Sequence, residues 1–282
     1  MGIRDLREDS LGSKEQYQEA HECYFDMADM EARIYRLRAT VGFFDADVKL
    51  RLAPAAYWRI LQNAAAGHAA ALLAATEDLR RGGQTWMLSK MRLEVLRHPV
   101  LGETVEVETW PSTRVKGARA YRDFVLRDGR GEICATASSL WVIVDLASRR
   151  PVRIPEAIVA LCHDPGYEIP PLEEGWLAGP EQVESETEFR SYWSDADQNE
   201  HVNNVTMVRW AVDALPLEFL DRHEVVSVEA QYRMEVKIGE VIRVKRDLAG
   251  GLVRQELRNH AGALVALVHT RWRRLDATDV AP

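Results

Sequence analysis

The sequence predicts an α+β fold made of two related modules, each with one helix followed by a mostly antiparallel sheet. Three pairs of matching segments indicate the duplication. Asp45-Ala46-Asp47 recurs 150 positions later as Asp195-Ala196-Asp197, Gly102-Glu103 recurs 137 positions later, and Leu126-Arg127 recurs 131 positions later. The order is the same in both halves, which we interpret as a duplication whose second copy has shorter loops. The alternative is that two unrelated sheets share common strand and turn residues.

The first half is expected to contain an initial strand, one helix and then several strands. Pro54 suits the first turn of the helix, and apolar side chains at helical spacing give that helix a broad buried face. The helix should end by Gly82-Gly83. Strand-like segments follow, separated by turn signals such as Asp128-Gly129. They cover roughly 86–95, 104–110, 119–127 and 133–144.

The second half repeats this order with a helix over 202–214, stopped by Pro216. Its strands are expected around 227–235, 241–247, 253–258 and 264–273. The stretch 164–182 is rich in proline and glycine, which is typical of an irregular linker. We therefore expect an N-terminal extension over 1–34, a first module over 35–163, this linker, and a second module over 183–282.

Two helices, each wrapped by an antiparallel sheet, would form a tandem double hotdog, although other α+β arrangements fit the same pattern. The net charge of -8 argues against general binding to nucleic acid or anionic membranes. Cys23, Cys134 and Cys162 lie too far apart to suggest a disulfide framework or a C-x-x-C metal site. The acid-rich beginning lacks the apolar core of a signal peptide, and every apolar run is too short to cross a membrane. We expect a soluble protein in a reducing cytoplasm.

The segment before the second helix carries the residues best suited to chemistry. Asp197, Asn199 and His201 are spaced by two, so an extended backbone would place an acid, an amide and an imidazole on one face. Asn203 and Asn204 suit a helix start, where free backbone N–H groups can stabilise the negative charge on a carbonyl under attack. Taken singly, these residues would be interpreted as a turn and a helix cap. The complete pattern favours a site.

The run D-x-N-x-H-V-N-N at 197–204, followed by Trp210, resembles the catalytic segment of the acyl-acyl carrier protein (acyl-ACP) thioesterases of plants and bacteria. The likeness extends to 85–92 and 102–108 and covers roughly 35–275. It implies a double hotdog fold and hydrolysis of fatty acyl thioesters in fatty acid biosynthesis, with no metal and no organic cofactor. Acyl carrier protein is the implied partner, and a homodimer is a possible assembly.

By this resemblance Asp197, Asn199 and His201 align with the family's catalytic residues. Glu235, in Tyr232-Arg233-Met234-Glu235, is the fourth candidate and is expected in a strand. The plant enzymes commonly follow that glutamate with a cysteine, whereas this chain has Val236, so a Cys-His mechanism is not available there. Glu235 or Asp197 would either activate water or attack the carbonyl directly, and the sequence does not separate these routes.

The first module is expected to be catalytically silent, because Lys49 and Arg51 occupy the positions of Asn199 and His201 at the 150 offset. Its expected task is to hold the acyl chain. Trp86, Met87 and Met91 are candidate substrate-binding residues, with ordinary core packing as the alternative. We interpret His68 as a packed helix residue and Trp141 and Trp272 as core anchors.

The surface arginines and the identity of the carrier leave further alternatives open. The stretches 149–153 and 271–274 are interpreted as solvated charges that could also receive an acidic carrier protein. The alternatives to an acyl-ACP thioesterase are an acyl-CoA thioesterase with the same site and a non-catalytic acyl-binding protein.

Overall fold

The computed structural model describes residues 33–72, 74–172 and 175–276. Ten strands of this part form one continuous sheet, and β6 (Pro151–Val152) pairs with the C-terminal end of β5. All the strand pairs are antiparallel. The order across the sheet is β1 (Tyr35–Thr40), β3 (Thr104–Pro111), β4 (Arg119–Asp128), β5 (Ile133–Asp145), β2 (Gln84–Val95), β8 (His223–Tyr232), β11 (Leu264–Arg274), β10 (Leu252–Asn259), β9 (Val241–Ala249) and β7 (Ser185–Arg190).

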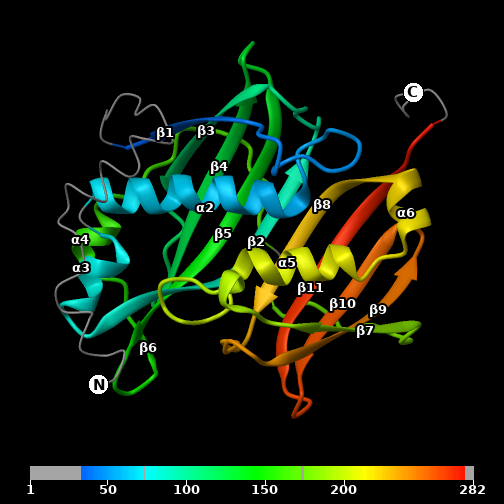
Figure 1. The fold of residues 1–282 in the computed structure, drawn as a ribbon. Helices are drawn as coiled ribbons and strands as arrows, with labels where there is room; N and C mark the ends of the chain where they lie inside the picture. The colour runs from blue at the N-terminus through cyan, green and yellow to red at the C-terminus, as the bar shows by residue number, and fades with distance from the viewer. Residues whose placement is uncertain (1–32, 73, 173–174, 277–282) are drawn as a thin grey trace.

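The strand order confirms the duplication. From the centre outward, β2, β5, β4, β3 and β1 match β8, β11, β10, β9 and β7. The two copies meet at β2 and β8, where Met91 pairs with Ala230. The first half of the chain builds one side of the sheet and the second half builds the other (Figure 1).

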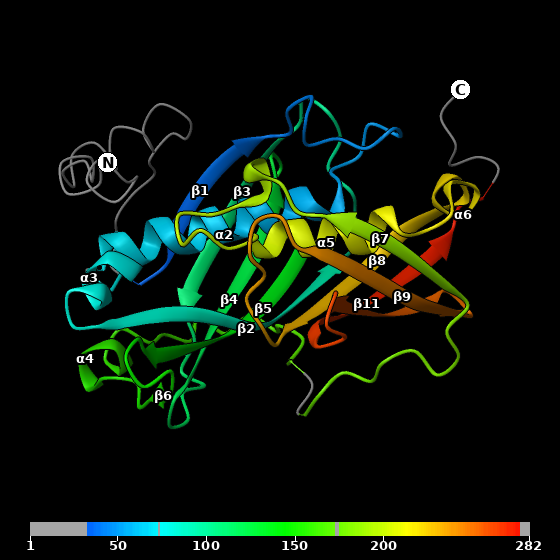
Figure 2. The same ribbon diagram turned by 60° about the horizontal axis from the view of Figure 1, so that its bottom comes forward.

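Two helices lie side by side against the same face of the sheet, α2 (Pro54–Ala71) from the first half and α5 (Asn204–Asp213) from the second (Figures 1 and 2). Their buried faces and the inward side chains of both half-sheets form a single hydrophobic core. The Trp58 indole of α2 donates a hydrogen bond to the Tyr232 hydroxyl at 3.0 Å, which ties the two halves together. The double hotdog prediction is therefore confirmed.

The helix ends follow local chemistry. Pro54 begins α2 as predicted, but α2 ends at Ala71, and a separate short helix, α3 (Thr76–Arg80), precedes Gly82-Gly83. The second helix begins at Asn204 instead of 202, because the Asn203 side chain caps it by accepting the amide of Val205 at 2.9 Å. Beyond Pro216 lies a short helix that the sequence analysis missed, α6 (Leu217–Arg222). Another short helix, α4 (Glu156–Val159), follows β6.

The predicted linker contains no helix or strand among its described residues. It packs against the outer face of the sheet, where Tyr167 lies 5.4 Å from Trp110 between ring centroids and Leu177 donates its amide to the Gln231 side chain at 2.8 Å. The predicted N-terminal extension, apart from residues 33 and 34, and with it Cys23, lies outside the described residues. Within the described part of the chain, no helix has the length and apolar character needed to cross a membrane.

The three residues interpreted as packed are confirmed in that role. His68 is buried, stacks on Tyr35 with a centroid distance of 5.6 Å, and its Nδ1 accepts from Arg122 at 3.0 Å. Trp141 and Trp272 pack against the core, and each indole donates to a hydroxyl two positions earlier on its strand, at 2.8 Å and 2.7 Å.

Candidate active site

The segment from Asp197 to His201 is a tight turn, so the extended backbone expected from the sequence was wrong. The Asp197 amide donates to the His201 carbonyl at 2.8 Å, and the Glu200 amide donates to the Asp197 carbonyl at 3.0 Å. The Asp197 carboxylate accepts the Asn199 amide at 2.7 Å and the Asn199 side-chain amide at 3.3 Å. Glu200 has a φ of 63°, which closes the turn. An aspartate that bonds the backbone two residues ahead favours such a turn over a strand.

Backbone pairing beyond the turn brings Glu235 to His201. The Val202 amide donates to the Val236 carbonyl at 2.8 Å, and His201 forms a bridge with Lys237. As a result the His201 Nε2 lies 3.5 Å from the Glu235 Oε2. The prediction of a strand at Glu235 was wrong, because β8 ends at Tyr232 and Glu235 lies in the loop to β9. A loop can direct this carboxylate toward His201, whereas in a strand the side-chain direction would be fixed by the alternation between the two faces of the sheet.

The site is partly open to solvent. The side chains of His201 and Glu235 are 28% and 31% exposed, so solvent reaches both groups. The first residue of α5, Asn204, lies three residues after His201, and the first backbone N–H groups of the helix carry the positive end of the helix dipole. The site thus combines two carboxylates, an imidazole and an amide beside a helix N-terminus.

The two carboxylates differ in how they are held. Both Asp197 oxygens accept hydrogen bonds from Asn199. The Glu235 Oε2 faces His201, and within the described part of the chain no hydrogen bond to the Glu235 Oε1 is formed. Asp197 is therefore built into the turn, whereas Glu235 keeps one carboxylate oxygen without a hydrogen bond from the described residues.

Two arginines of the first half reach this site, and the sequence analysis missed both as site residues. The Arg149 Nη2 lies 3.1 Å from the Glu235 Oε2, and Arg80 donates to the Asn199 Oδ1. Arg149 had been interpreted as a surface charge. The partners are 86 and 119 positions apart in the chain, so no local pattern connects them.

The three candidate substrate-binding residues lie on β2 in the first module. Trp86 is partly buried, and its indole donates to the Ala74 carbonyl at 2.9 Å, between α2 and β2. Met87 is also partly buried, whereas Met91 is fully buried in the core. Burial of Met91 is equally what core packing requires.

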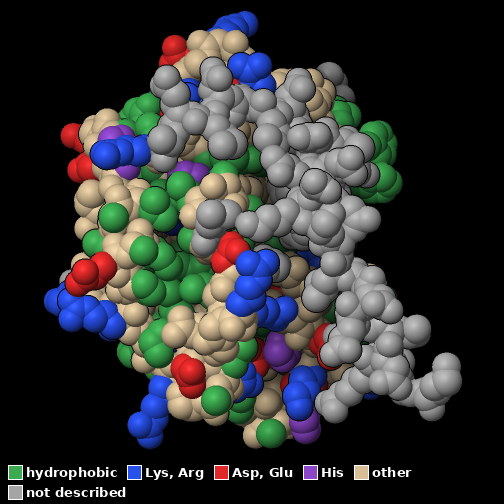
Figure 3. Space-filling view, turned by 90° about the vertical axis from the view of Figure 1, so that its left-hand side faces the viewer, with side chains coloured by type: hydrophobic (Ala, Val, Ile, Leu, Met, Phe, Trp, Pro, Cys, Tyr) green, Lys and Arg blue, Asp and Glu red, His purple; other side chains and the backbone are tan. Residues whose placement is uncertain are grey.

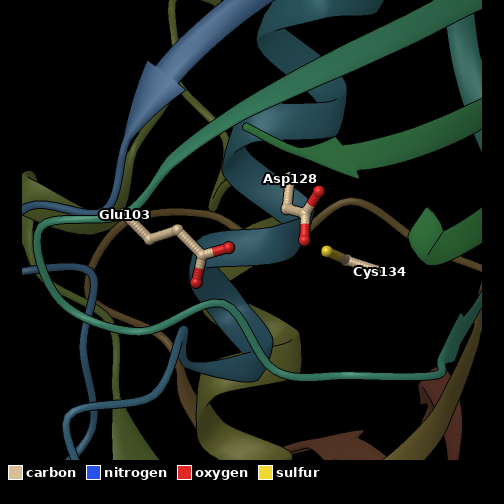
Figure 4. A group of neighbouring side chains, drawn as sticks. All are labelled: Glu103, Asp128 and Cys134. Atoms are coloured by element: carbon tan, nitrogen blue, oxygen red, sulfur yellow. The ribbon is translucent and has the colours of Figure 1, made fainter. Parts of the chain in front are cut away.

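A separate cluster of metal-ligand type consists of Glu103, Asp128 and Cys134 in the first module (Figure 4). The Arg97 guanidinium binds all three: its Nη2 lies 2.5 Å from Glu103, 2.9 Å from Asp128 and 3.0 Å from the Cys134 sulfur. Burial is the main cause that raises the pKa of the Cys134 thiol. The cluster is therefore a binding site for an arginine of the same chain.

Two chloroplastic relatives are similar to this chain in sequence. The chloroplastic acyl-acyl carrier protein hydrolase FATB3 of Cuphea viscosissima is 30% identical, over 70% of this chain and 51% of its own length. The chloroplastic oleoyl-acyl carrier protein thioesterase 1 of Arabidopsis thaliana is 28% identical, over 65% of this chain and 55% of its own length. The chain thus spans about half the length of the curated relatives it matches.

Solved structures share the whole double sheet. An acyl-ACP thioesterase from Bacteroides thetaiotaomicron has a TM-score of 0.78 at 22% identity, covering 87% of this chain and 100% of its own. The 12:0-ACP thioesterase from Umbellularia californica has a TM-score of 0.79 at 23% identity, covering 88% and 100%. At these identities the likeness shows the fold.

Two family models match consecutive parts of the chain. The acyl-ACP thioesterase N-terminal domain matches residues 16–162, and the C-terminal domain matches residues 179–274. The first match alone covers more than half of the chain, and the second contains the turn, α5 and Glu235. The chain therefore belongs to the acyl-ACP thioesterase family.

Proposed function

We propose that this protein hydrolyses fatty acyl thioesters carried by acyl carrier protein and releases free fatty acid. The contact between His201 and Glu235 at 3.5 Å, beside the Asp197–Asn199 turn and the start of α5, is the observation that carries the proposal. It supplies a base, an orienting group and a site for a developing negative charge within one small region. The relatives are an acyl-acyl carrier protein hydrolase and an oleoyl-acyl carrier protein thioesterase, which supports the choice of substrate.

In the proposed reaction Glu235 takes a proton from water, and the oxygen of that water attacks the thioester carbonyl. His201 orients the Glu235 carboxylate and the water. Backbone N–H groups at the start of α5 stabilise the oxyanion, which then collapses and expels the thiolate, and the proton held by Glu235 passes to the leaving sulfur. Asp197 and Asn199 hold the turn that positions His201.

Direct attack by a carboxylate is the competing route. It would form an acyl-enzyme anhydride that water then hydrolyses. Turnover in labelled water distinguishes the two, because only direct attack places labelled oxygen in the Glu235 or Asp197 carboxylate. The Glu235 Oε1 accepts no hydrogen bond from the described residues, which suits either route. Both oxygens of Asp197 accept hydrogen bonds from Asn199, which argues against Asp197 as the attacking group.

The first module, proposed to span 35–163, would hold the acyl chain, and the second, over 183–282, would carry the chemistry. Trp86 and Met87 on β2 are only partly buried and are proposed to line the acyl site, together with Met91, which is buried in the core on the same strand. Residence in the cytoplasm and a homodimer stay predictions.

A hydrolysis assay tests the function. A series of acyl chain lengths, each presented on acyl carrier protein and on CoA, should show a higher kcat/KM on the carrier protein. A higher kcat/KM on CoA would identify an acyl-CoA thioesterase. Tight binding of acyl carrier protein without any turnover would identify a non-catalytic acyl-binding protein and would refute the proposal.

A further inference from the structure

Two cations of the first module contact the proposed catalytic groups of the second. Arg149 lies in the turn between β5 and β6, and Arg80 is the last residue of α3. Both elements lie at the same end of the molecule, next to the segment that leads into α5 (Figure 1). The surface at this end mixes hydrophobic side chains with arginine and lysine side chains (Figure 3).

Arg149 binds the same carboxylate oxygen that faces the imidazole. The Glu235 Oε2 lies 3.1 Å from the Arg149 Nη2 and 3.5 Å from the His201 Nε2. A planar guanidinium and an imidazole on one oxygen hold the carboxylate in a single orientation and leave its second oxygen for water. Because the Arg149 side chain is 63% exposed, this contact contributes little to stability. Its effect is to orient Glu235.

The backbone at Arg149 supports a role for its side chain. Arg149 has a φ of 57°, in the left-handed region that glycine adopts most easily. Among the described residues only Leu50, Arg149 and Glu200 are non-glycine residues with positive φ, and the last two border the site. The turn itself is closed by Asp145, whose carboxylate accepts the Ser148 amide at 2.7 Å and whose carbonyl accepts the Arg149 amide at 2.9 Å. The Arg149 side chain is thus not needed to form the turn.

Arg80 holds the other end of the site. The Asn199 Oδ1 accepts from Arg80, and the Asn199 Nδ2 donates to the Asp197 Oδ2 at 3.3 Å. The amide is therefore fixed from both sides, with its orientation set by a donor from α3. The first copy makes a similar contact between modules. Lys49, which occupies the position of Asn199, donates to the backbone carbonyls of Leu220 and His223 in and just after α6, the helix that corresponds to α3.

We propose that the first module completes the catalytic site of the second: Arg149 positions Glu235, and Arg80 positions Asn199. The inference rests on the proposed thioester hydrolysis. Neither arginine touches the reacting atoms in this arrangement, so both are positioning residues. A separated second module would therefore retain Asp197, His201 and Glu235 but would lack the groups that orient two of the four site residues.

The test uses the full chain and a small acyl thioester of N-acetylcysteamine, which lacks carrier and phosphate. Arg149→Ala should lower kcat about tenfold while KM stays within about twofold, because misplaced groups slow the chemical step. Arg149→Lys should recover part of the loss. Arg149→Gly should match Arg149→Ala in rate but unfold no more easily than wild type, since glycine accepts the left-handed backbone. Arg80→Ala should cause a smaller loss of kcat.

Matched controls exist in the same module. Arg130, exposed on the turn between β4 and β5, and Arg81, which follows Arg80 and pairs with Asp78 at 3.7 Å, should tolerate alanine without loss of rate. Equal rates for wild type and Arg149→Ala would overturn the inference. A loss confined to KM on carrier-bound substrate would also overturn it, because Arg149 would then contact the carrier.

A crystal structure of Arg149→Ala separates failure of the inference from failure of the proposed function. The Glu235 carboxylate should leave its position beside His201, and an unmoved carboxylate would refute a positioning role whatever the rate. Absence of hydrolysis by wild type on every thioester would instead refute the proposed function, and the carboxylate position would still decide the inference.

Discussion

The turn before α5 and the turn before α2 have the same backbone conformation. In each, an aspartate amide donates to the carbonyl four residues ahead at 2.8 Å. The aspartate carboxylate accepts the amide two residues ahead, at 2.8 Å for Asp47 and 2.7 Å for Asp197. The residue third after the aspartate is left-handed in both, with a φ of 60° for Leu50 and 63° for Glu200. Of the proposed site residues, only the aspartate is common to both turns.

The side chains that differ hold the modules together in the first copy. Arg51, in the position of His201, pairs with Glu224 of the second module. His98 occupies the position of Glu235 in the first copy. In the first copy the Leu52 amide donates to the carbonyl of Pro99, the residue after His98, at 2.8 Å. In the second copy the Val202 amide donates to the carbonyl of Val236, the residue after Glu235, also at 2.8 Å. The His98 Nε2 lies 2.9 Å from the Val225 carbonyl oxygen.

Burial lowers the pKa of His98, so its ring is neutral and makes a contact between modules without a charge.

The comparison teaches that duplication preserved the geometry of the turn while its two copies took different tasks. One copy kept an acid, an amide and an imidazole open to solvent. The other became a contact that joins the modules. The two copies should therefore respond to substitution in opposite ways.

The largest expected difference concerns the paired aspartates. Asp197→Ala, His201→Ala or Glu235→Ala should lower kcat/KM by at least about a hundredfold while the protein stays folded, as expected when acid-base or orienting groups are removed. Asp47→Ala should leave the chemical step nearly intact. Steady-state kinetics with circular dichroism measure both. A loss in Asp47→Ala equal to that in Asp197→Ala, at unchanged thermal stability, would end the distinction between the copies.

The second prediction sharpens the structural role of the first copy. Glu224→Gln should lower the free energy of unfolding by about 2 kcal/mol, less than for a fully buried pair because the Arg51 side chain is 18% exposed. Urea denaturation measures the change. The kcat should stay the same, because Glu224 contacts Arg51 in the first copy of the turn, which is not the proposed active site. A fall in kcat without a fall in stability would contradict the assignment.

A third prediction concerns the extra length of α2. When the two copies are aligned 150 positions apart, α2 extends beyond the position at which α5 ends, and His68 lies in this extension. In the second copy Pro216 follows the end of α5. Burial, with Arg122 beside the ring, lowers the pKa of His68 to about 3. The folded protein therefore keeps His68 neutral below about pH 6.5, where the unfolded chain takes up a proton.

Because the folded pKa is depressed, stability from this residue is present above about pH 6.5 and is lost as pH falls toward about 3. The loss should amount to at most about 1.4 kcal/mol per pH unit. Urea denaturation of wild type and His68→Leu at several pH values measures it as a difference that shrinks on acidification. A difference independent of pH would show that His68 takes up its proton at the same pH in the folded and the unfolded protein.

The smallest expected effect separates the two helix starts. The Asn203 side chain caps α5, whereas Ala53 at the start of α2 offers no side-chain cap. Asn203→Ala should lower the free energy of unfolding by about 1 kcal/mol, and Asn203→Asp should restore most of it because a carboxylate caps as well. Thermal or urea denaturation can resolve this change. Equal stability of all three proteins would mean that core packing alone fixes the start of α5.

Local signals in the sequence determined much of the fold. The order of helices and strands, the duplication, the irregular linker and the asparagine cap of α5 depend on periodicity, on turn residues and on a side chain bonding its own backbone, and these act over a few residues. The candidate residues Asp197, Asn199 and His201 are readable for the same reason, since they lie in one short run. The shape of that run was not readable, because Asp197 closes a turn where alternation suggested a strand.

Only the tertiary structure decided how the site is assembled. Glu235 reaches His201 through the pairing of two loops, Arg149 and Arg80 arrive from the other module, and Arg51 meets Glu224 across the same junction. These contacts join residues from 34 to 173 positions apart. They depend on sheet register and on the antiparallel pairing of β2 with β8, which no single segment of the sequence encodes. The sequence by itself therefore determined the main elements and the four candidate site residues, and the packing of the two copies determined which side chains meet.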